Sequence, residues 1–210
     1  MQYSTFAAID IGSYDVILEI FEISKKQGIR SVDKICHRME LGKDTYTLGK
    51  IRPEMEEELC RVLADFVRIM EGYRVDDYRA TASSAISEAS NSLYVLGKIH
   101  QLTGLSVTVL SNSEQRFLSY KALAAMEDNF NKIIEKGTAI LDLDGGSFQI
   151  SLFDKDALVT TQNIRMGSLR IRERLAGIQS ETEHYEGMVE ELIWNEVSSF
   201  KKMYLKDRKI

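Results

Sequence analysis

Residues 138–147 read TAILDLDGGS, an apolar run that carries an aspartate near its end and closes on two glycines and a serine. A short apolar run bounded by glycine predicts a buried strand followed by a tight turn. The residues after the turn, 148–153, predict the return strand, and residues 157–164 predict a third strand. The stretch therefore predicts a three-stranded unit whose first strand places a carboxylate next to a turn.

A similar design occurs at the start of the chain, where residues 8–13 read AIDIGS. Residues 15–21 and 29–41 predict two further strands, so each copy is followed by two strands and then a helix. A single copy would favour an unrelated hairpin that uses a glycine turn. Two copies with matching successors favour a duplication, which predicts two related lobes with a cleft between them.

The period of the apolar residues changes to that of a helix over residues 53–72, which begin with a proline and end with a glycine. Shorter patterns predict a strand at 78–82, then a serine-rich turn and a helix that ends at about residue 101. A further strand is predicted at 106–110 and a further helix at 113–126. The C-terminal part predicts a long helix over residues 185–204. We expect a capping box of Ser180 and Glu183 before this helix, and Trp194 packed near its buried face.

Composition restricts the classes of partner. The formal net charge of −5 disfavours a nucleic-acid backbone, while 44% apolar and 28% charged residues are ordinary for a globular protein. No run approaches the roughly 20 apolar residues of a membrane span, and the N-terminus lacks a secretory signal pattern. Cys36 and Cys60 have neither metal-site nor disulfide spacing, so both are expected to be reduced thiols. These features predict a soluble, cytoplasmic protein without nucleic-acid or membrane partners.

Both turns contain the residue types that bind phosphate. A turn without side chains lets backbone N–H groups approach an anion closely, as Gly12, Gly145 and Gly146 would allow. Ser13 and Ser147 add hydroxyl donors at the same points of the two turns. The turns therefore predict two phosphate-binding loops.

The aspartates before the turns, Asp10 and Asp142, would project carboxylates toward the mouth of the predicted cleft. Carboxylates beside phosphates require a bridging hard cation such as Mg²⁺, because the like charges otherwise repel. The alternative for either aspartate is a residue that caps its own turn. With two copies, we expect the aspartates to face each other across the cleft as candidate metal ligands.

Three further stretches stand in a fixed order with the two turns: ASSAISEASN at 82–91, LSNSEQ at 110–115 and RMG at 165–167. The ordered set resembles the exopolyphosphatase / guanosine pentaphosphate phosphatase family of the actin-like ATPase superfamily. The resemblance implies an α/β protein with an actin-like, ribonuclease-H-type fold, in which mixed sheets are flanked by helices. It implies a complete first lobe at residues 1–128 and the beginning of a second, related lobe at residues 129–210.

A second lobe that stops early would expose apolar surface, which we expect on the helix at 185–204 and on the strands at 138–153. An open sheet edge and an uncovered helix face invite pairing with another chain. A homodimer through this surface is therefore the expected protein partnership, beside a phosphate-rich small molecule or polyphosphate as ligand.

The family hydrolyses phosphoanhydride bonds, usually with Mg²⁺, and releases terminal phosphate from polyphosphate or guanosine pentaphosphate. The resemblance implies that Asp142 is the metal-associated aspartate and that both glycine turns bind phosphate. It also points to Glu114 and Gln115 as catalytic candidates, because the family has two adjacent glutamates there and the second usually activates the water.

The first turn departs from the family pattern at Tyr14 and Asp15, where Asn and Ser are common, and four further departures bear directly on activity. Ser87 stands where an arginine is expected, Gln115 replaces the second glutamate, Asp144 replaces the first glycine of the loop, and Gln149 replaces an acidic residue. Glutamine cannot accept a proton, whereas a general base typically contributes about 10²–10⁴ in rate. The departures favour weak activity, or else a catalytically dead binding or sensor module for polyphosphate or guanosine phosphates. A sugar kinase or related ATPase on the same fold is a third reading.

Overall fold

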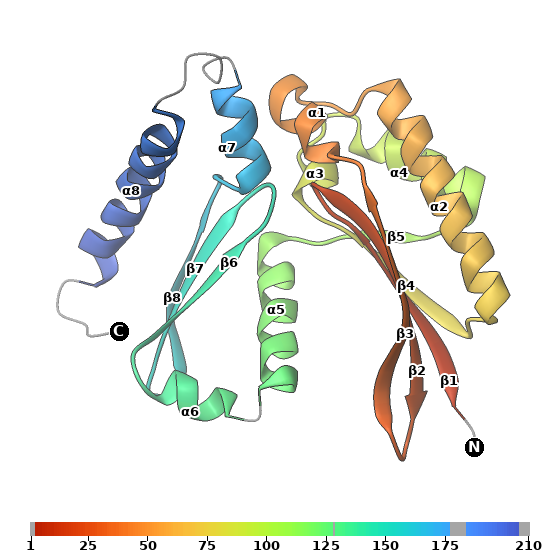
Figure 1. The fold of residues 1–210 in the computed structure, drawn as a ribbon, viewed down its shortest axis with the longest axis horizontal. Helices are drawn as coiled ribbons and strands as arrows, with labels where there is room; N and C mark the ends of the chain where they lie inside the picture. The colour runs from red at the N-terminus through yellow and green to blue at the C-terminus, as the bar shows by residue number, and fades with distance from the viewer. Residues whose placement is uncertain (1–2, 128, 177–183, 206–210) are drawn as a thin grey trace. The chain divides into compact units, whose positions relative to one another are not determined.

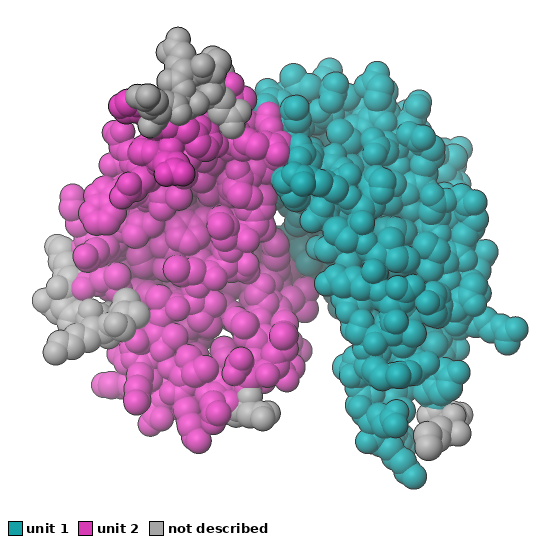
Figure 2. Space-filling model, viewed as in Figure 1, with its two compact units in different colours: residues 1–111 teal, residues 112–210 magenta. Residues whose placement is uncertain are grey.

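The computed structural model describes residues 3–127, 129–176 and 184–205. The chain forms two compact units, residues 1–111 and residues 112–210 (Figure 2). Each unit has its own sheet and its own helices (Figure 1). Each also has its own apolar core. The predicted mixed α/β architecture, with sheets flanked by helices, is confirmed.

The first unit is organised by a five-stranded sheet in the order β3-β2-β1-β4-β5. The strands β1 (Ser4–Ile11), β2 (Asp15–Ser24) and β3 (Gly28–Arg38) form the antiparallel meander that the sequence predicts. The strands β4 (Asp77–Ala82) and β5 (Val107–Val109) continue the sheet in parallel beyond β1. The turn after β1 is therefore at the carboxyl end of parallel neighbours, where open α/β sheets bind ligands.

Four helices complete this unit: α1 (Leu41–Leu48), α2 (Pro53–Tyr73), α3 (Ser84–Ser87) and α4 (Ser92–Thr103). The proline at the start of α2 suits a position where no N–H is needed, and the apolar stripe of α2 enters the core. The core joins Leu59, Leu63 and Phe66 of this stripe to alternate residues of the central strands, among them Ile9, Ile11 and Leu18. The short helix α1 is not predicted by the sequence pattern.

The second unit repeats the meander with β6 (Thr138–Leu143), β7 (Phe148–Asp154) and β8 (Ala157–Ile164), which pair antiparallel in the order β6-β7-β8. The helices α5 (Asn112–Met126) and α6 (Phe130–Glu135) precede the sheet. All three strands match the ranges that the sequence predicts to within one residue, since β7 ends at Asp154 and not at residue 153, whereas α6 is an addition.

The helix α5 packs on one face of this sheet. The Tyr120 hydroxyl donates to Ser151 Oγ at 2.5 Å, and the Tyr120 ring meets the Phe153 ring edge-on at 5.2 Å between centroids. Arg116 Nη1 reaches Thr161 Oγ1 at 3.4 Å. The compact units thus divide the chain between residues 111 and 112, one helix earlier than the boundary after residue 128 that the sequence suggests.

The helices α7 (Ser168–Leu175) and α8 (Tyr185–Tyr204) supply apolar residues to the other face of the sheet. Successive residues of a strand point to opposite faces, so the residues of β7 that face this core alternate with those that face α5. The buried members of the core are Ile150, Leu152, Ile164, Met166, Ile171, Leu175 and Phe200. The helix α7 is not predicted by the sequence, and the expected capping box of Ser180 and Glu183 lies outside the described residues.

Part of the apolar surface is open, as the sequence predicts for the strands of the second unit. Leu141 and Leu143 on β6 are 63% and 62% exposed. Trp194 on α8 is 64% exposed, which corrects the expectation that it packs near the buried face. The homodimer that this surface suggested stays a prediction.

The two cysteines are free thiols, Cys36 exposed on β3 and Cys60 buried in α2. Burial raises the pKa of the Cys60 thiol above its ordinary value, so it stays protonated and unreactive at neutral pH. None of the helices that the structure describes combines the length and the apolar character needed to cross a membrane.

Candidate functional site

The two glycine turns have the same hydrogen-bonding plan, but not in the register that the sequence suggests. The turns comprise residues 12–15 and 144–147, and in each the first residue donates its N–H to the carbonyl of the fourth. Gly12 N lies 2.9 Å from Asp15 O, and Asp144 N lies 3.0 Å from Ser147 O. Asp144 therefore corresponds to Gly12, and the expected equivalence of Ser13 with Ser147 is wrong.

The first turn is supported by a ring of three hydroxyl groups. Ser13 Oγ lies 2.6 Å from the Tyr46 hydroxyl and 3.2 Å from Ser84 Oγ, and the Tyr46 hydroxyl lies 2.8 Å from Ser84 Oγ. Both serines are buried. Because the Ser13 hydroxyl is bonded to neighbours, it positions the turn as well as being a candidate phosphate donor. Tyr46 comes from α1 and is missed by the sequence, which carries no signal for it.

Replacing Tyr46 by phenylalanine is expected to lower the free energy of unfolding of the first unit by about 1 kcal/mol. The change removes one hydroxyl and leaves the buried Ser13 and Ser84 with fewer partners. Urea unfolding followed by circular dichroism would measure the loss. Tyr94→Phe is the matched control, because Tyr94 is 65% exposed. Equal stability of the two variants would contradict a supporting role for the ring.

The second turn already holds an anion, and that anion is its own aspartate. Asp144 Oδ1 accepts hydrogen bonds from Gly146 N at 2.6 Å and from Ser147 N at 2.7 Å. Asp144 Oδ2 accepts from Gln115 Nε2 of α5 at 3.4 Å. Gly146 N, which the sequence assigns to phosphate, and Ser147 N are therefore engaged by the carboxylate. Two of the departures from the family pattern, Gln115 and Asp144, also contact each other.

The first turn of α7 holds the carbonyl groups of the same loop. Leu169 N and Arg170 N both donate to Gly145 O at 3.1 Å, and Arg170 Nε donates to Gly146 O at 3.0 Å. Gly167, just before this helix, allows the close approach. A Cβ atom there would lie 2.4 Å from the Gly145 carbonyl carbon and from Ser147 N. Hydrogen bonds thus hold both N–H groups and carbonyl groups of this loop.

Asp142, the next-to-last residue of β6, is half-buried and accepts a hydrogen bond from Ser119 Oγ at 2.9 Å. Its register partner on β7 is Gln149, which is 3% exposed. Gln149 Oε1 is buried and has no hydrogen-bond partner within the described part of the chain. Both side chains line a cavity of about 280 Å³ beside α5.

Among the described residues, no group of three or more His, Cys, Asp or Glu side chains is placed to bind a metal ion. The donors beside β6 nevertheless fit Mg²⁺ in kind. Mg²⁺ prefers oxygen ligands and is commonly held by one or two carboxylates, with water and substrate phosphates in the other positions. The Asp142 carboxylate and the orphaned Gln149 amide oxygen offer such a partial set. The sequence pattern marks Gln149 only as a departure from the family and gives no sign that its amide oxygen is available to a metal ion.

Asp10 holds the same place in β1 that Asp142 holds in β6, next to the last residue, and its side chain is exposed. The two aspartates belong to different units. That they face each other across a cleft, and that Asp10 takes part in metal binding, stay predictions.

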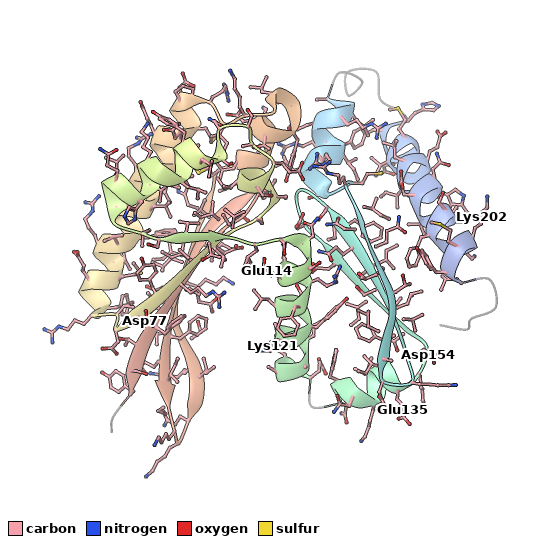
Figure 3. All side chains as sticks on the ribbon, turned by 180° about the vertical axis from the view of Figure 1, so that it is seen from behind. Asp77, Glu114, Lys121, Glu135, Asp154 and Lys202 are labelled. Carbon is pink, nitrogen blue, oxygen red and sulfur yellow. The ribbon has the colours of Figure 1, made fainter. Side chains whose placement is uncertain are left out.

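The remaining catalytic candidates lie in the first turn of α5. Figure 3 shows Glu114 at the start of this helix, and its side chain is exposed. Gln115, its neighbour, is half-buried and bonded to Asp144. Ser87, the position of the expected arginine, ends α3 in the first unit and is exposed. The structure therefore brings Gln115 to the second turn.

Comparison with known proteins relates the chain to phosphatases. A model of the Ppx/GppA phosphatase family matches residues 19–208. A bifunctional 3-dehydroquinate synthase/phosphatase of Fusobacterium nucleatum is 22% identical over 174 residues, which are 80% of this chain and 26% of the relative. Exopolyphosphatase 1 of Mycobacterium leprae is 25% identical over 144 residues, which are 68% of this chain and 41% of the relative. The chain thus spans less than half the length of these relatives.

A solved structure of the Aquifex aeolicus member of the Ppx/GppA family superposes with a TM-score of 0.70 at 23% identity. The match covers 95% of this chain and 63% of the other. It confirms the predicted actin-like α/β fold over the part that the two chains share. Since the family model extends over nearly all of the 210 residues, the chain belongs to the Ppx/GppA phosphatase family.

Proposed function

We propose that this chain provides the phosphate-binding part of a Mg²⁺-dependent phosphoanhydride hydrolase. The substrate would be polyphosphate or guanosine pentaphosphate, from which terminal phosphate is released. The observation that carries the proposal is the turn at 144–147, held on the start of α7 with Asp142 on the strand before it. Family membership and the exopolyphosphatase relatives support the same reaction class.

The backbone of Gly145, Gly146 and Ser147 would bind phosphate in the second unit, and Gly12 and Ser13 would do so in the first. These groups lie in turns whose geometry is fixed by hydrogen bonds, so they would be preorganised for an anion. The role expected of them is to position the phosphoryl group and to stabilise its charge, which is where most catalysis of phosphoryl transfer arises.

Asp142 and Gln149 would hold Mg²⁺, and Asp10 is the candidate ligand from the first unit. A metal ion bound there would neutralise charge on the phosphoryl oxygens. The role of the chain's own residues is to fix the oxygen donors: Ser119 orients the Asp142 carboxylate, and the strand pairing of β6 with β7 sets Gln149 beside it.

Activation of the attacking water is the step for which this chain lacks the expected proton acceptor. Gln115 can orient a water molecule but cannot accept its proton. Glu114 can accept a proton, yet neighbours on a helix point about 100° apart, so Glu114 does not simply replace residue 115. Slow turnover is therefore expected, with Glu114 as the base if turnover occurs.

A binding or sensor module for polyphosphate or guanosine phosphates is the second candidate. The contact between Gln115 and Asp144 favours it, because a hydrolase would need a proton acceptor at residue 115 and a turn without an internal anion at residue 144. Tight binding without phosphate release would identify the module, and release of phosphate would identify the hydrolase.

Phosphate release is expected to be slow, to require Mg²⁺, and to fall at least about tenfold in Glu114→Gln if Glu114 is the base. The measurement is the initial rate of phosphate release from polyphosphate and from guanosine pentaphosphate, with and without a chelator. Glu135→Gln, at the end of α6, is the matched control for loss of one charge. Binding of polyphosphate in calorimetry with no release by any variant would replace the hydrolase with the binding module.

A further inference from the structure

We propose that Asp144 is a built-in anion that occupies the phosphate-binding N–H groups of the turn at 144–147. External phosphate then binds to this turn only when the Asp144 carboxylate leaves it. The inference rests on the proposed function, since it concerns control of the same turn.

The first support is the geometry of the occupied donors. Gly146 N and Ser147 N lie 2.6 Å and 2.7 Å from the same oxygen, Asp144 Oδ1. Hydrogen bonds from backbone N–H groups to an ionised oxygen are short and roughly twice as strong as bonds between neutral groups. A phosphate oxygen would have to compete with this oxygen for the same two donors. The Asp144 carboxylate thus keeps external anions out of the turn by occupying its two N–H donors, in addition to repelling negative charge.

The second support is the turn of the first unit, which serves as an internal comparison. It closes with the same bond from its first N–H to its fourth carbonyl, but its first residue is Gly12 and carries no side chain. A Cβ atom on Gly12 would lie 2.9 Å from Asp15 O, so that turn excludes a side chain at this position. A turn of this kind therefore closes without a carboxylate in the first unit, and the Asp144 carboxylate is an additional group in the second.

The third support is that the surroundings hold the turn and complement the carboxylate. Leu169 N and Arg170 N fix the Gly145 carbonyl, and Arg170 Nε fixes the Gly146 carbonyl. With the backbone held in this way, the side chain of Asp144 is the part that can move aside. Gln115 donates its amide N–H to the second carboxylate oxygen of Asp144, whereas a glutamate at residue 115 would repel that carboxylate. The amide at residue 115 and the carboxylate at residue 144 therefore suit each other.

The test compares wild type with Asp144→Ala and Asp144→Asn, using sodium tripolyphosphate with Mg²⁺ as the probe. Residue 144 is not among the residues with positive φ, so alanine fits its backbone. Asparagine removes the charge but keeps an oxygen acceptor for Gly146 N and Ser147 N. Glu135→Ala, on α6, controls for the loss of one negative charge in the same unit.

We expect Asp144→Ala to bind tripolyphosphate at least about tenfold more tightly than wild type in calorimetry. Asp144→Asn is expected to gain less than about threefold, because its amide oxygen still occupies the donors. In ¹⁵N-resolved NMR spectra, the amide signals of Gly146 and Ser147 should shift at tripolyphosphate concentrations about tenfold lower in Asp144→Ala than in wild type. A dispersed spectrum shows that the variant is folded; Asp144→Gly, which copies the first turn, is the substitute if it is not.

Each other outcome overturns the inference in a recognisable way. Equal binding by wild type and Asp144→Ala, with the same two amide signals shifting, would refute it and leave the proposed function standing. Equal gains for asparagine and alanine would show that charge repulsion acts in place of occupancy. Absence of binding by every variant would refute both the inference and the phosphate-binding role of the turn.

Discussion

Phosphate release from polyphosphate is expected to rise about a hundredfold or more when Gln115→Glu and Asp144→Gly are combined in one chain. The first change supplies a proton acceptor, and a positioned general base contributes about 10²–10⁴ in rate. The second change frees Gly146 N and Ser147 N for the phosphoryl oxygens. The prediction rests on the proposed hydrolase and is measured as initial rates in the presence of Mg²⁺.

The single variants are expected to gain much less than the double variant. Glutamate at 115 alone would bring a second carboxylate against Asp144, since the present side chains lie 3.4 Å apart at their bonded atoms. Glycine at 144 alone would leave the site without the base. Residues in direct contact show interaction energies of about 0.5–3 kcal/mol in double-mutant cycles. If the changes in activation free energy of the two single variants add up to that of the double variant, positions 115 and 144 act independently.

Replacing Gly167 by alanine is expected to lower the free energy of unfolding of the second unit by about 3 kcal/mol. The added Cβ would lie 2.4 Å from the Gly145 carbonyl carbon and from Ser147 N, and both are backbone atoms that no rotamer change can move away. Either the turn or the start of α7 must shift, which breaks the bonds from Leu169 N and Arg170 N to Gly145 O. Urea unfolding followed by circular dichroism measures the loss.

Gly187→Ala is the matched control for this substitution. Gly187 lies in α8, is exposed, and a Cβ there would meet nothing within 4 Å. Alanine in an exposed helical position is expected to stabilise by up to about 1 kcal/mol. Similar stability of the Gly167 and Gly187 variants would mean that the turn and α7 adapt to each other more freely than their close packing indicates.

The sequence predicts the regular elements well where one periodic pattern decides. The strands that carry Asp10 and Asp142 are correct because short apolar runs end at turn residues, and α2 is correct because its stripe repeats at the helical period. The helices α1, α6 and α7 are missed because each is at most eight residues long, too short for the period to be established.

The contacts of the site are harder to predict, because they join residues that lie far apart in the chain. The sequence marks Gln115 and Asp144 as departures from the family pattern, but not that the two are bonded to each other. It offers no signal for Tyr46 beside Ser13. It aligns the two turns by their serines, whereas the backbone bonds align Gly12 with Asp144. Pairings of this kind depend on which strand and helix faces meet.

The packing of α5 on the second sheet decides where the protein should be cut for separate study of its parts. A fragment that ends at residue 128 would carry α5 without the strands that receive Tyr120 and Arg116. The complementary fragment would lose the cover over Ser151 and Phe153. Both pieces would then expose side chains that the intact protein pairs. A cut between residues 111 and 112 leaves Gln115, Asp142 and Asp144 together in one piece.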